Sequence, residues 1–274
     1  MPTIHLDDHE DISYRSVGEG VTTLLCMHGW AGSGAYFDPM IAYVDPSGQR
    51  TVTFDLPSHG GSADATGPFT LDRLADAVIA VADAAGADTF VLLGFSMSGK
   101  FAQYVTHRHP DRVLGQVLVA GCPVGELALP PDLLEDWYAR AGDAERLAEI
   151  VLTYSTQPIP RHVLDVLGHD AARVPLPALR GTMELVTSTS FVEEVAGSVV
   201  PTLVVGGAHD LIFTPQALAD GVVEPLAHAQ LQLLDCGHEV PVELPRQLAG
   251  LVDAFVAELG SARWAARSTR TELR

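Results

Sequence analysis

Short apolar runs alternate with longer amphipathic stretches along most of the chain. The runs are rich in Val, Leu and Thr, and their length is typical of strands buried on both faces of a sheet. Residues 11–17, which precede a Gly-Glu-Gly turn, predict a flanking antiparallel strand. The predicted buried strands cover residues 22–28, 50–55, 88–95, 113–121, 200–207 and 229–235.

Amphipathic helices are predicted between these strands. In residues 70–86 the apolar positions recur at helical spacing, and Thr70 stands where an N-terminal cap belongs. Residues 98–108 and 245–259 show the same pattern. Strand–helix alternation indicates an α/β fold, in which helices flank a mostly parallel sheet.

The alternation breaks over residues 123–198, where four helical patterns follow one another without a strand. We expect residues 1–122 and 199–274 to form the α/β core. We expect 123–198 to form a helical cap, or lid, over the strand carboxyl ends, where such sheets bind ligands. A helical decoration without a role in binding is the alternative. The four patterns cover residues 131–141, 143–156, 159–171 and 178–189.

Composition narrows the class of protein. The 274 residues are 47% hydrophobic and 19% charged, enough apolar material for a large core and too much for general disorder. No apolar stretch is long enough to cross a membrane, and the amino terminus lacks the features of a secretory signal, which predicts a cytoplasmic protein. The net charge of −19 would repel phosphate backbones and anionic lipid surfaces. We therefore expect a small-molecule substrate and neither a nucleic-acid nor a membrane partner.

The segment Gly94-Phe95-Ser96-Met97-Ser98-Gly99 carries the strongest chemical signal. It follows a predicted strand and opens a predicted helix, which is the context of a nucleophile elbow. The sharp turn would expose the hydroxyl of Ser96, a weak nucleophile until a base accepts its proton. A Gly/Ser-rich connection without chemistry is the alternative for this segment alone.

Two later residues supply the missing partners. Asp210 and His238 each follow a predicted strand, so Ser, Asp and His occur in the order that such a triad requires. His238 would act as the base and Asp210 would orient its imidazole. Asp235 and Glu126 are alternative acids, although Asp235 is too near His238 in sequence to be preferred.

Acyl transfer also needs donors for the developing oxyanion. The backbone N–H of Trp30, in His28-Gly29-Trp30 after the first buried strand, is one candidate. The N–H of Met97, next to the nucleophile, is the other.

Together these motifs resemble the α/β-hydrolase superfamily of serine esterase and lipase type. Asp55-Leu56-Pro57-Ser58-His59-Gly60-Gly61-Ser62 and Gly207-Ala208-His209-Asp210 add to the match, which spans about residues 10 to 260. The resemblance implies an eight-stranded sheet, a Ser–Asp–His triad and a cap inserted after the sixth strand. A serine nucleophile argues against the dehalogenase and epoxide hydrolase relatives, which attack with a carboxylate.

Two positions depart from the family pattern. Ser98 and Ser58 stand where the family usually has glycine, and we expect only local adjustment at both.

The remaining signals in the sequence are weaker. Phe95, Trp137 and Tyr138 are candidates for the substrate pocket, although each is individually typical of ordinary packing. Lys100 is expected to face solvent. We expect no metal or other cofactor, because an exposed acidic terminus explains the His5–His9 segment better than a metal site. Arginines in the last residues suggest a charged tail or, alternatively, a homo-oligomer contact; they are Arg263, Arg267, Arg270 and Arg274.

These observations predict a cofactor-independent serine hydrolase that cleaves a carboxylic ester or lactone of a small, largely apolar substrate. The alternatives within the fold are a perhydrolase of the cofactor-free haloperoxidase type, an acyltransferase and a C–C bond hydrolase. A ligand-binding relative with little turnover is the alternative from another class.

Overall fold

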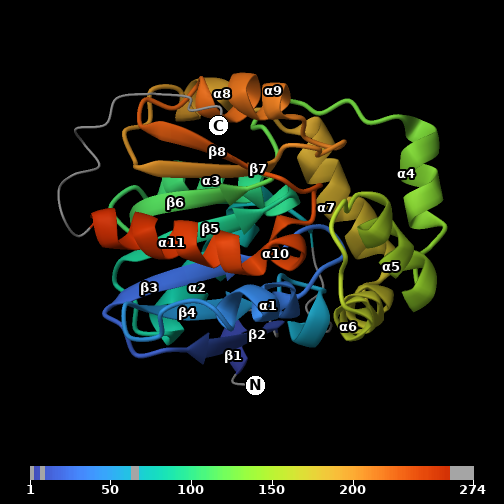
Figure 1. Ribbon diagram of the computed structural model, residues 1–274, viewed down its shortest axis with the longest axis horizontal. Helices are drawn as coiled ribbons and strands as arrows, with labels where there is room; N and C mark the ends of the chain where they lie inside the picture. Colours follow the sequence, from blue (N-terminus) through green and yellow to red (C-terminus); the bar gives the residue numbers. More distant parts are fainter. Residues whose placement is uncertain (1–2, 7–9, 63–67, 260–274) are drawn as a thin grey trace.

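An eight-stranded sheet organises the molecule (Figure 1). The computed structural model describes residues 3–6, 10–62 and 68–259. The order across the sheet is β1-β2-β4-β3-β5-β6-β7-β8, antiparallel where β2 meets β1 and β4, and parallel between all other neighbours. The strands are β1 (Thr3–Leu6), β2 (Glu10–Val17), β3 (Thr22–Met27), β4 (Gln49–Phe54), β5 (Phe90–Phe95), β6 (Val113–Val119), β7 (Thr202–Gly207) and β8 (Ala229–Leu234).

The predicted α/β class is therefore confirmed. Every predicted strand is present within a few residues of its expected bounds, and β1 is the one strand of the described chain that the sequence pattern missed. Its four residues are too few to show a period.

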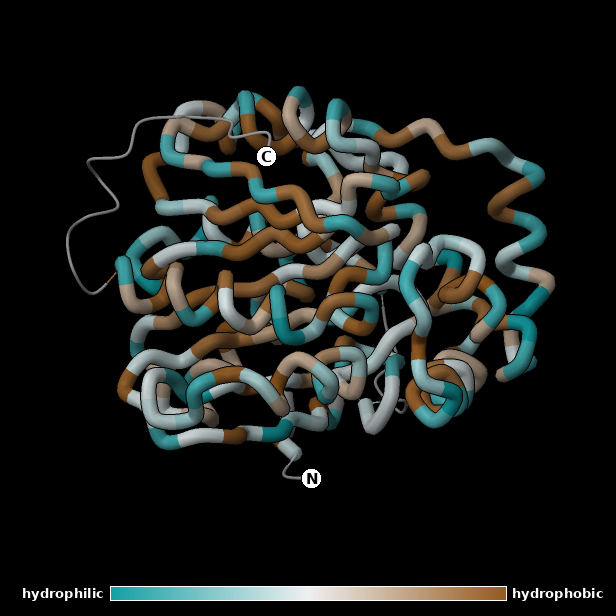
Figure 2. The backbone as a smooth tube through the Cα atoms, viewed as in Figure 1, coloured by the Kyte–Doolittle hydropathy of each residue, from teal (hydrophilic) through white to brown (hydrophobic). Residues whose placement is uncertain are grey.

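The sheet is buried on both faces, and neighbouring residues along a strand serve opposite faces. In β3, Leu25 packs in one apolar cluster with helices α2 (Leu71–Ala84) and α3 (Met97–Arg108). Leu24 packs in another cluster with α1 (Asp38–Ile41) and α11 (Pro245–Leu259). The apolar colouring along the central strands in Figure 2 follows from this burial.

Proline and capping side chains set where helices begin. Thr70 accepts a hydrogen bond from the backbone N–H of Arg73 at 3.2 Å and caps α2, as predicted.

Between β6 and β7 lie five helices rather than the predicted four, because Val192–Val195 forms an additional short helix. These helices are α4 (Pro131–Tyr138), α5 (Ala144–Thr153), α6 (Arg161–Ala172), α7 (Leu176–Ser188) and α8 (Val192–Val195).

Residues 123–198, hereafter the insertion, place α4, α5 and α6 beyond one end of the strands (Figure 1). Two short helices, α9 (Pro215–Leu218) and α10 (Val240–Glu243), follow β7 and β8. No helix in the described part of the chain is both long and apolar enough to span a bilayer. The arginine tail lies outside the described residues, as do Asp7, Asp8 and His9 of the metal candidate segment.

Candidate active site

The loops that follow β3, β5, β7 and β8 gather at one edge of the sheet, because the carboxyl ends of parallel strands face the same way. These loops carry Trp30, Ser96, Asp210 and His238. Residues from four distant parts of the sequence are thereby brought to one place.

Ser96 occupies a strained turn between β5 and α3. Its φ of 51° and ψ of −119° are unfavourable for a residue with a side chain. The turn is possible because its neighbours are small. A Cβ on Gly94 would lie 2.2 Å from the carbonyl oxygen of Ser98, and one on Gly99 would lie 2.4 Å from the Cα of Gly121.

A continuous hydrogen-bonded chain joins the three triad candidates. Ser96 Oγ lies 2.8 Å from Nε2 of His238, and Nδ1 of His238 lies 2.8 Å from Oδ2 of Asp210. The other carboxylate oxygen of Asp210 accepts the backbone N–H groups of Ile212 at 2.7 Å and Phe213 at 3.0 Å. These two bonds fix the orientation of the carboxylate toward the imidazole.

The alternative acids lie elsewhere. Asp235 is exposed and contacts Nε2 of His209 at 2.8 Å. Glu126 lies near Lys100, where burial lowers the pKa of the ammonium and the charge of Glu126 partly offsets that effect.

The electrostatics of the loop favour a protonatable His238. Burial alone would lower its pKa, but the hydrogen bond and the charge of Asp210 outweigh it, with further help from Glu239 and Glu243. The net effect raises the pKa of His238 above its ordinary value. An imidazolium at this position is thus stabilised.

Glu243, which no sequence motif identifies, anchors the loop that carries this histidine. One oxygen of its buried carboxylate accepts the backbone N–H groups of Gly237 at 3.1 Å, Thr156 at 2.6 Å and Gln157 at 2.8 Å. The histidine's own N–H donates to the carbonyl of Tyr154 at 2.8 Å. The α5–α6 connection of the insertion therefore holds the histidine loop directly.

The two candidate oxyanion donors lie on neighbouring loops. Met97 is the first residue of α3, so its N–H has no acceptor within the helix. The N–H of Trp30 donates to no other group among the described residues. Ala31, which follows it, has a φ of 56°, and the loop is braced where the backbone N–H of Leu56 donates to Nε2 of His28 at 3.0 Å.

We call residues 28–31, which carry the candidate donor Trp30, the oxyanion loop of the hypothesis, and aromatic side chains of the insertion pack on it. The indole N–H of Trp30 donates to the carbonyl of Leu179 in α7 at 2.9 Å. The rings of Trp137 and Tyr138 lie 5.4 and 6.3 Å from that of Trp30. Phe95, the third candidate for substrate contact, is buried, and its ring centroid lies 5.5 Å from that of His238.

A buried phenol–carboxyl pair beside His238 also escaped the sequence analysis. The hydroxyl of Tyr36 donates to Glu239 at 2.6 Å, and burial raises the pKa of Glu239 to about 7. Both residues line a cavity of about 60 Å³, together with Trp30 and apolar side chains of α5 and α6.

One prediction about this region is wrong. Lys100 does not face solvent but is wholly buried, with its ammonium among backbone carbonyls of the insertion. The helical period placed it on α3 correctly, but the insertion covers that face.

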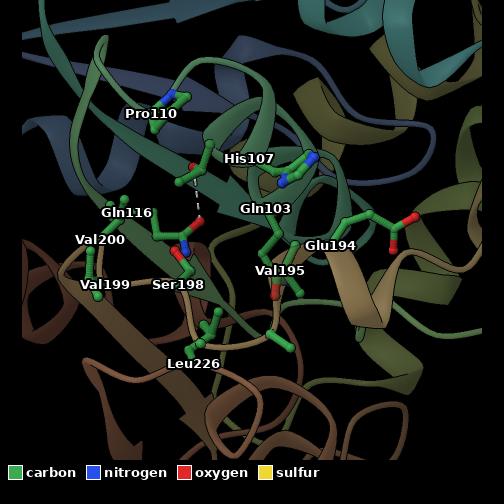
Figure 3. A pocket seen from close by; sticks show the side chains of 13 residues that line it. Gln103, His107, Pro110, Gln116, Glu194, Val195, Ser198, Val199, Val200 and Leu226 are labelled. Atoms are coloured by element: carbon green, nitrogen blue, oxygen red, sulfur yellow. Dashed lines mark hydrogen bonds between the residues drawn. The ribbon is translucent and has the colours of Figure 1, made fainter.

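The volume of a cavity alone does not identify the candidate active site. A pocket of about 310 Å³ lies between α3, α8 and β6, lined by side chains that include Gln103, Gln116 and Leu226 (Figure 3). The dashed bond in that view joins Thr106 to Gln116 at 3.1 Å. The three triad candidates are not among its lining residues.

No group of three or more His, Cys, Asp or Glu side chains in the described part of the chain is arranged to hold a metal ion. The three cysteines are buried and unpaired, and burial raises the pKa of both Cys122 and Cys236 to about 12.

Comparison with known proteins agrees with this architecture. Residues 22–152 match the family model described as the α/β hydrolase fold. The 3-oxoadipate enol-lactonase 2 of Acinetobacter baylyi is 26% identical over 93% of this chain and 98% of that protein. The pimeloyl-[acyl-carrier protein] methyl ester esterase of Xanthomonas campestris is 27% identical over 89% of this chain and 98% of its own length.

Among solved structures, the enol-lactonase from Burkholderia xenovorans LB400 superposes with a TM-score of 0.79 at 21% identity. The match covers 93% of this chain and all of that one. At that identity the likeness shows the fold. The chain has the α/β-hydrolase fold, and its relatives support a hydrolase of ester or lactone bonds.

Proposed function

We propose that the protein is a serine hydrolase that cleaves a carboxylic ester or lactone of a small, largely apolar, uncharged substrate. The observation that carries the proposal is the chain of two 2.8 Å contacts from Ser96 through His238 to Asp210. Ser96 also lies in the sharp strand-to-helix turn that an activated serine nucleophile requires.

The reaction follows from these positions. As Ser96 Oγ attacks the carbonyl carbon, its proton passes to Nε2 of His238, and Asp210 stabilises the imidazolium. The N–H groups of Trp30 and Met97 donate to the oxyanion of the tetrahedral intermediate. Collapse expels the alkoxide, which takes the proton from His238 and leaves an acyl-enzyme on Ser96.

Water completes the cycle. His238 accepts a proton from the attacking water, the second tetrahedral intermediate collapses, and the proton returns to Ser96 Oγ. The products are the carboxylic acid and the alcohol, or one hydroxy acid from a lactone. No step draws on a metal or other cofactor.

The surroundings of the site favour a substrate without negative charge. Asp210, Glu239 and Glu243 are all buried around His238. The chain's lone lysine is engaged elsewhere. A negatively charged substrate would lie close to these three carboxyl groups in a site of low dielectric constant, and it would be repelled. A 3-oxoadipate enol-lactone carries a carboxylate, so the substrate named for that relative is disfavoured here.

The insertion acts in this proposal as a cap. Its contacts with the Trp30 and His238 loops support a role in covering the acyl group. The small cavity beside Trp30 and Tyr36 would take a short apolar acyl chain. Trp137 and Tyr138 do not line this cavity, but their rings lie against that of Trp30, and through it we expect them to limit the length of the acyl chain.

The same acyl-enzyme can partition to other acceptors. Peroxide as the acceptor would make the protein a perhydrolase, and an alcohol as the acceptor would make it an acyltransferase. Product ratios with water, peroxide and alcohols competing would separate these two from a hydrolase. A C–C bond hydrolase differs in the acylation step, because its leaving group is a carbon acid, and turnover of a C–C bonded substrate would identify it. A low-turnover binding protein would be stabilised by a ligand without forming product.

The decisive experiment compares hydrolysis of p-nitrophenyl butyrate by the wild type and by Ser96→Ala, with Ser47→Ala on an exposed turn as the matched control. We expect Ser96→Ala to lose activity by at least about 10⁴-fold. A serine-reactive phosphonate should label the Ser96 peptide alone. Equal rates for wild type and Ser96→Ala would refute the proposal. Cytoplasmic location and homo-oligomerisation stay predictions, which fractionation and light scattering would test.

A further inference from the structure

Lys100 is the only lysine of the chain, and it lies one helical turn after Ser96 on α3. Its side chain is fully buried although no buried carboxylate pairs with it. A buried cation is costly unless its donors are satisfied, so this position calls for an explanation.

Three backbone carbonyls receive the ammonium. Nζ donates to Gly125 at 2.8 Å, to Val186 at 2.8 Å and to Thr189 at 2.6 Å. An ammonium has three donors, so each is used. The ammonium also lies over the aromatic ring of Phe191, with Nζ 6.0 Å from the ring centroid.

These carbonyls belong to the two ends of the insertion, which run side by side. The N–H of Phe191 donates to Val124 and the N–H of Leu127 donates to Thr187, both at 3.2 Å. We call residues 124–127 and 186–191 the stalk. The ammonium of Lys100 thus ties both chains of the stalk to the helix that begins at the nucleophile.

The chemistry of the acceptors explains why a cation stands here. Val186 lies in the last turn of α7 and Thr189 is its C-terminal cap, where helix carbonyls lack partners inside the helix. The same end of a helix carries partial negative charge that favours an ammonium. A neutral apolar side chain would leave three buried carbonyls unsatisfied.

Helix α7 leads from the stalk to the oxyanion loop. Its residue Leu179 accepts the indole N–H of Trp30 at 2.9 Å. We propose that Lys100 is a positioning residue, which fixes the stalk and thereby sets α7 so that Trp30 holds its backbone N–H toward the oxyanion. The effect on catalysis rests on the function proposed above, whereas the coupling between Lys100 and Trp30 does not.

The coupling can be measured without activity, because one lysine gives one labelling signal. Sulfo-N-hydroxysuccinimide acetate would be applied to the native protein, and acetylation of the Lys100 peptide followed by mass spectrometry. We expect labelling at least about a hundredfold slower than in guanidinium, since the amine reacts only when the stalk opens. Labelling of the native protein at the rate seen in guanidinium would refute the proposal that Lys100 is held in the stalk.

The variant Trp30→Phe removes the bond to Leu179 and keeps the lysine. Because coupling is reciprocal, it should accelerate acetylation of Lys100 about tenfold. Tyr36→Phe is the matched control, since it removes a buried hydrogen bond of the core that does not involve α7. Equal acceleration by both variants, or none by Trp30→Phe, would overturn the proposal.

Activity provides the second arm. Lys100→Met should lower kcat for p-nitrophenyl butyrate by about tenfold to a hundredfold, the scale expected when a remote shift misplaces catalytic groups. Combined with Trp30→Phe it should lower kcat no further than the worse single variant. Thr106→Val, which removes another buried bond of α3 outside this path, should leave kcat unchanged. Multiplicative losses for Lys100→Met would refute the path through Trp30. If Lys100→Met does not fold, the labelling arm decides alone, and inactivity of the wild type would refute the proposed function without touching the labelling result.

Discussion

The hydroxyl of Ser98 donates a hydrogen bond to the backbone carbonyl of His28. Both residues are fully buried. The bond ties the first turn of α3, two residues after Ser96, to the end of β3 where the oxyanion loop begins. The two loops that would supply the oxyanion donors are therefore braced against each other by the side chain that replaces the family's usual glycine.

Replacing Ser98 by glycine should loosen this brace. The carbonyl of His28 would lose its partner, and we expect the free energy of unfolding to fall by about 1–3 kcal/mol. The kcat for p-nitrophenyl butyrate should fall about tenfold, because an oxyanion donor is no longer fixed. Thr106→Val, which loses a buried bond farther along α3, should share the loss of stability but keep kcat. Equal kcat values for Ser98→Gly and Thr106→Val would show that the bond is only structural.

Asp210 and Asp235 offer a matched pair for the acid. Asp210→Asn should leave the fold intact but lower kcat by about 10⁴-fold, because the imidazole would adopt the wrong tautomer. Asp235 forms an exposed pair with His209, and such pairs contribute little to stability or positioning. Asp235→Asn should therefore stay within about twofold of the wild type. A larger loss for Asp235→Asn than for Asp210→Asn in steady-state assays would reverse the assignment.

The pH dependence should report the raised pKa of His238. The imidazole must be neutral to accept the proton of Ser96, so kcat/KM should fall as the pH drops through that pKa. The midpoint should lie above the reference value of about 6.5 for histidine. In Glu239→Gln the midpoint should move to lower pH, because the charge of Glu239 helps to raise it. A midpoint unmoved by Glu239→Gln would remove that charge from the account.

Glu239 also makes a prediction about stability. Burial raises its pKa to about 7, well above that of an exposed glutamate, so the folded protein binds the proton more tightly than the unfolded chain. Its protonation stabilises the fold at low pH, and this contribution is lost as the pH rises from about 4.3 through 7. Glu239→Gln should thus raise Tm relative to the wild type at pH 8 more than at pH 5, by calorimetry. Glu149→Gln, on the surface of α5, should change Tm equally at both pH values.

The parts of the site that could be predicted are those encoded locally. The turn at Ser96 tolerates only small residues at positions 94 and 99, so a short sequence motif is enough to predict it. The strands were evident because residues such as Leu24 and Leu25 serve opposite faces of one buried sheet.

The remainder depends on contacts between distant segments. Glu243 accepts N–H groups from the insertion, and Lys100 donates to carbonyls, so in each case the partner is backbone with no side-chain signature. A lysine on an amphipathic helix is ordinarily exposed, and only the path of the insertion buries this one. Glu239 could not be predicted because its partner, the side chain of Tyr36, lies far earlier in the chain.

Trp137 provides the test of the cap. Its ring is buried, 5.4 Å from that of Trp30 and 5.9 Å from that of Tyr154, so it fills space directly beside the oxyanion loop. Trp137→Ala should open that space, at a cost of about 3–5 kcal/mol in the free energy of unfolding. We expect this change to leave an acetyl group unaffected, whereas longer acyl chains should gain room.

The measurement is a series of p-nitrophenyl esters from acetate to octanoate. Trp137→Ala should change the ratio of kcat/KM for octanoate to that for acetate about tenfold or more in favour of octanoate, the scale at which pocket contacts discriminate substrates. Leu152→Ala, at an exposed position of α5, is the matched control and should leave the ratio as it is. If Trp137→Ala instead lowers kcat/KM for every ester by one common factor, then the insertion supports the oxyanion loop without selecting the acyl group, and its role as a cap is refuted.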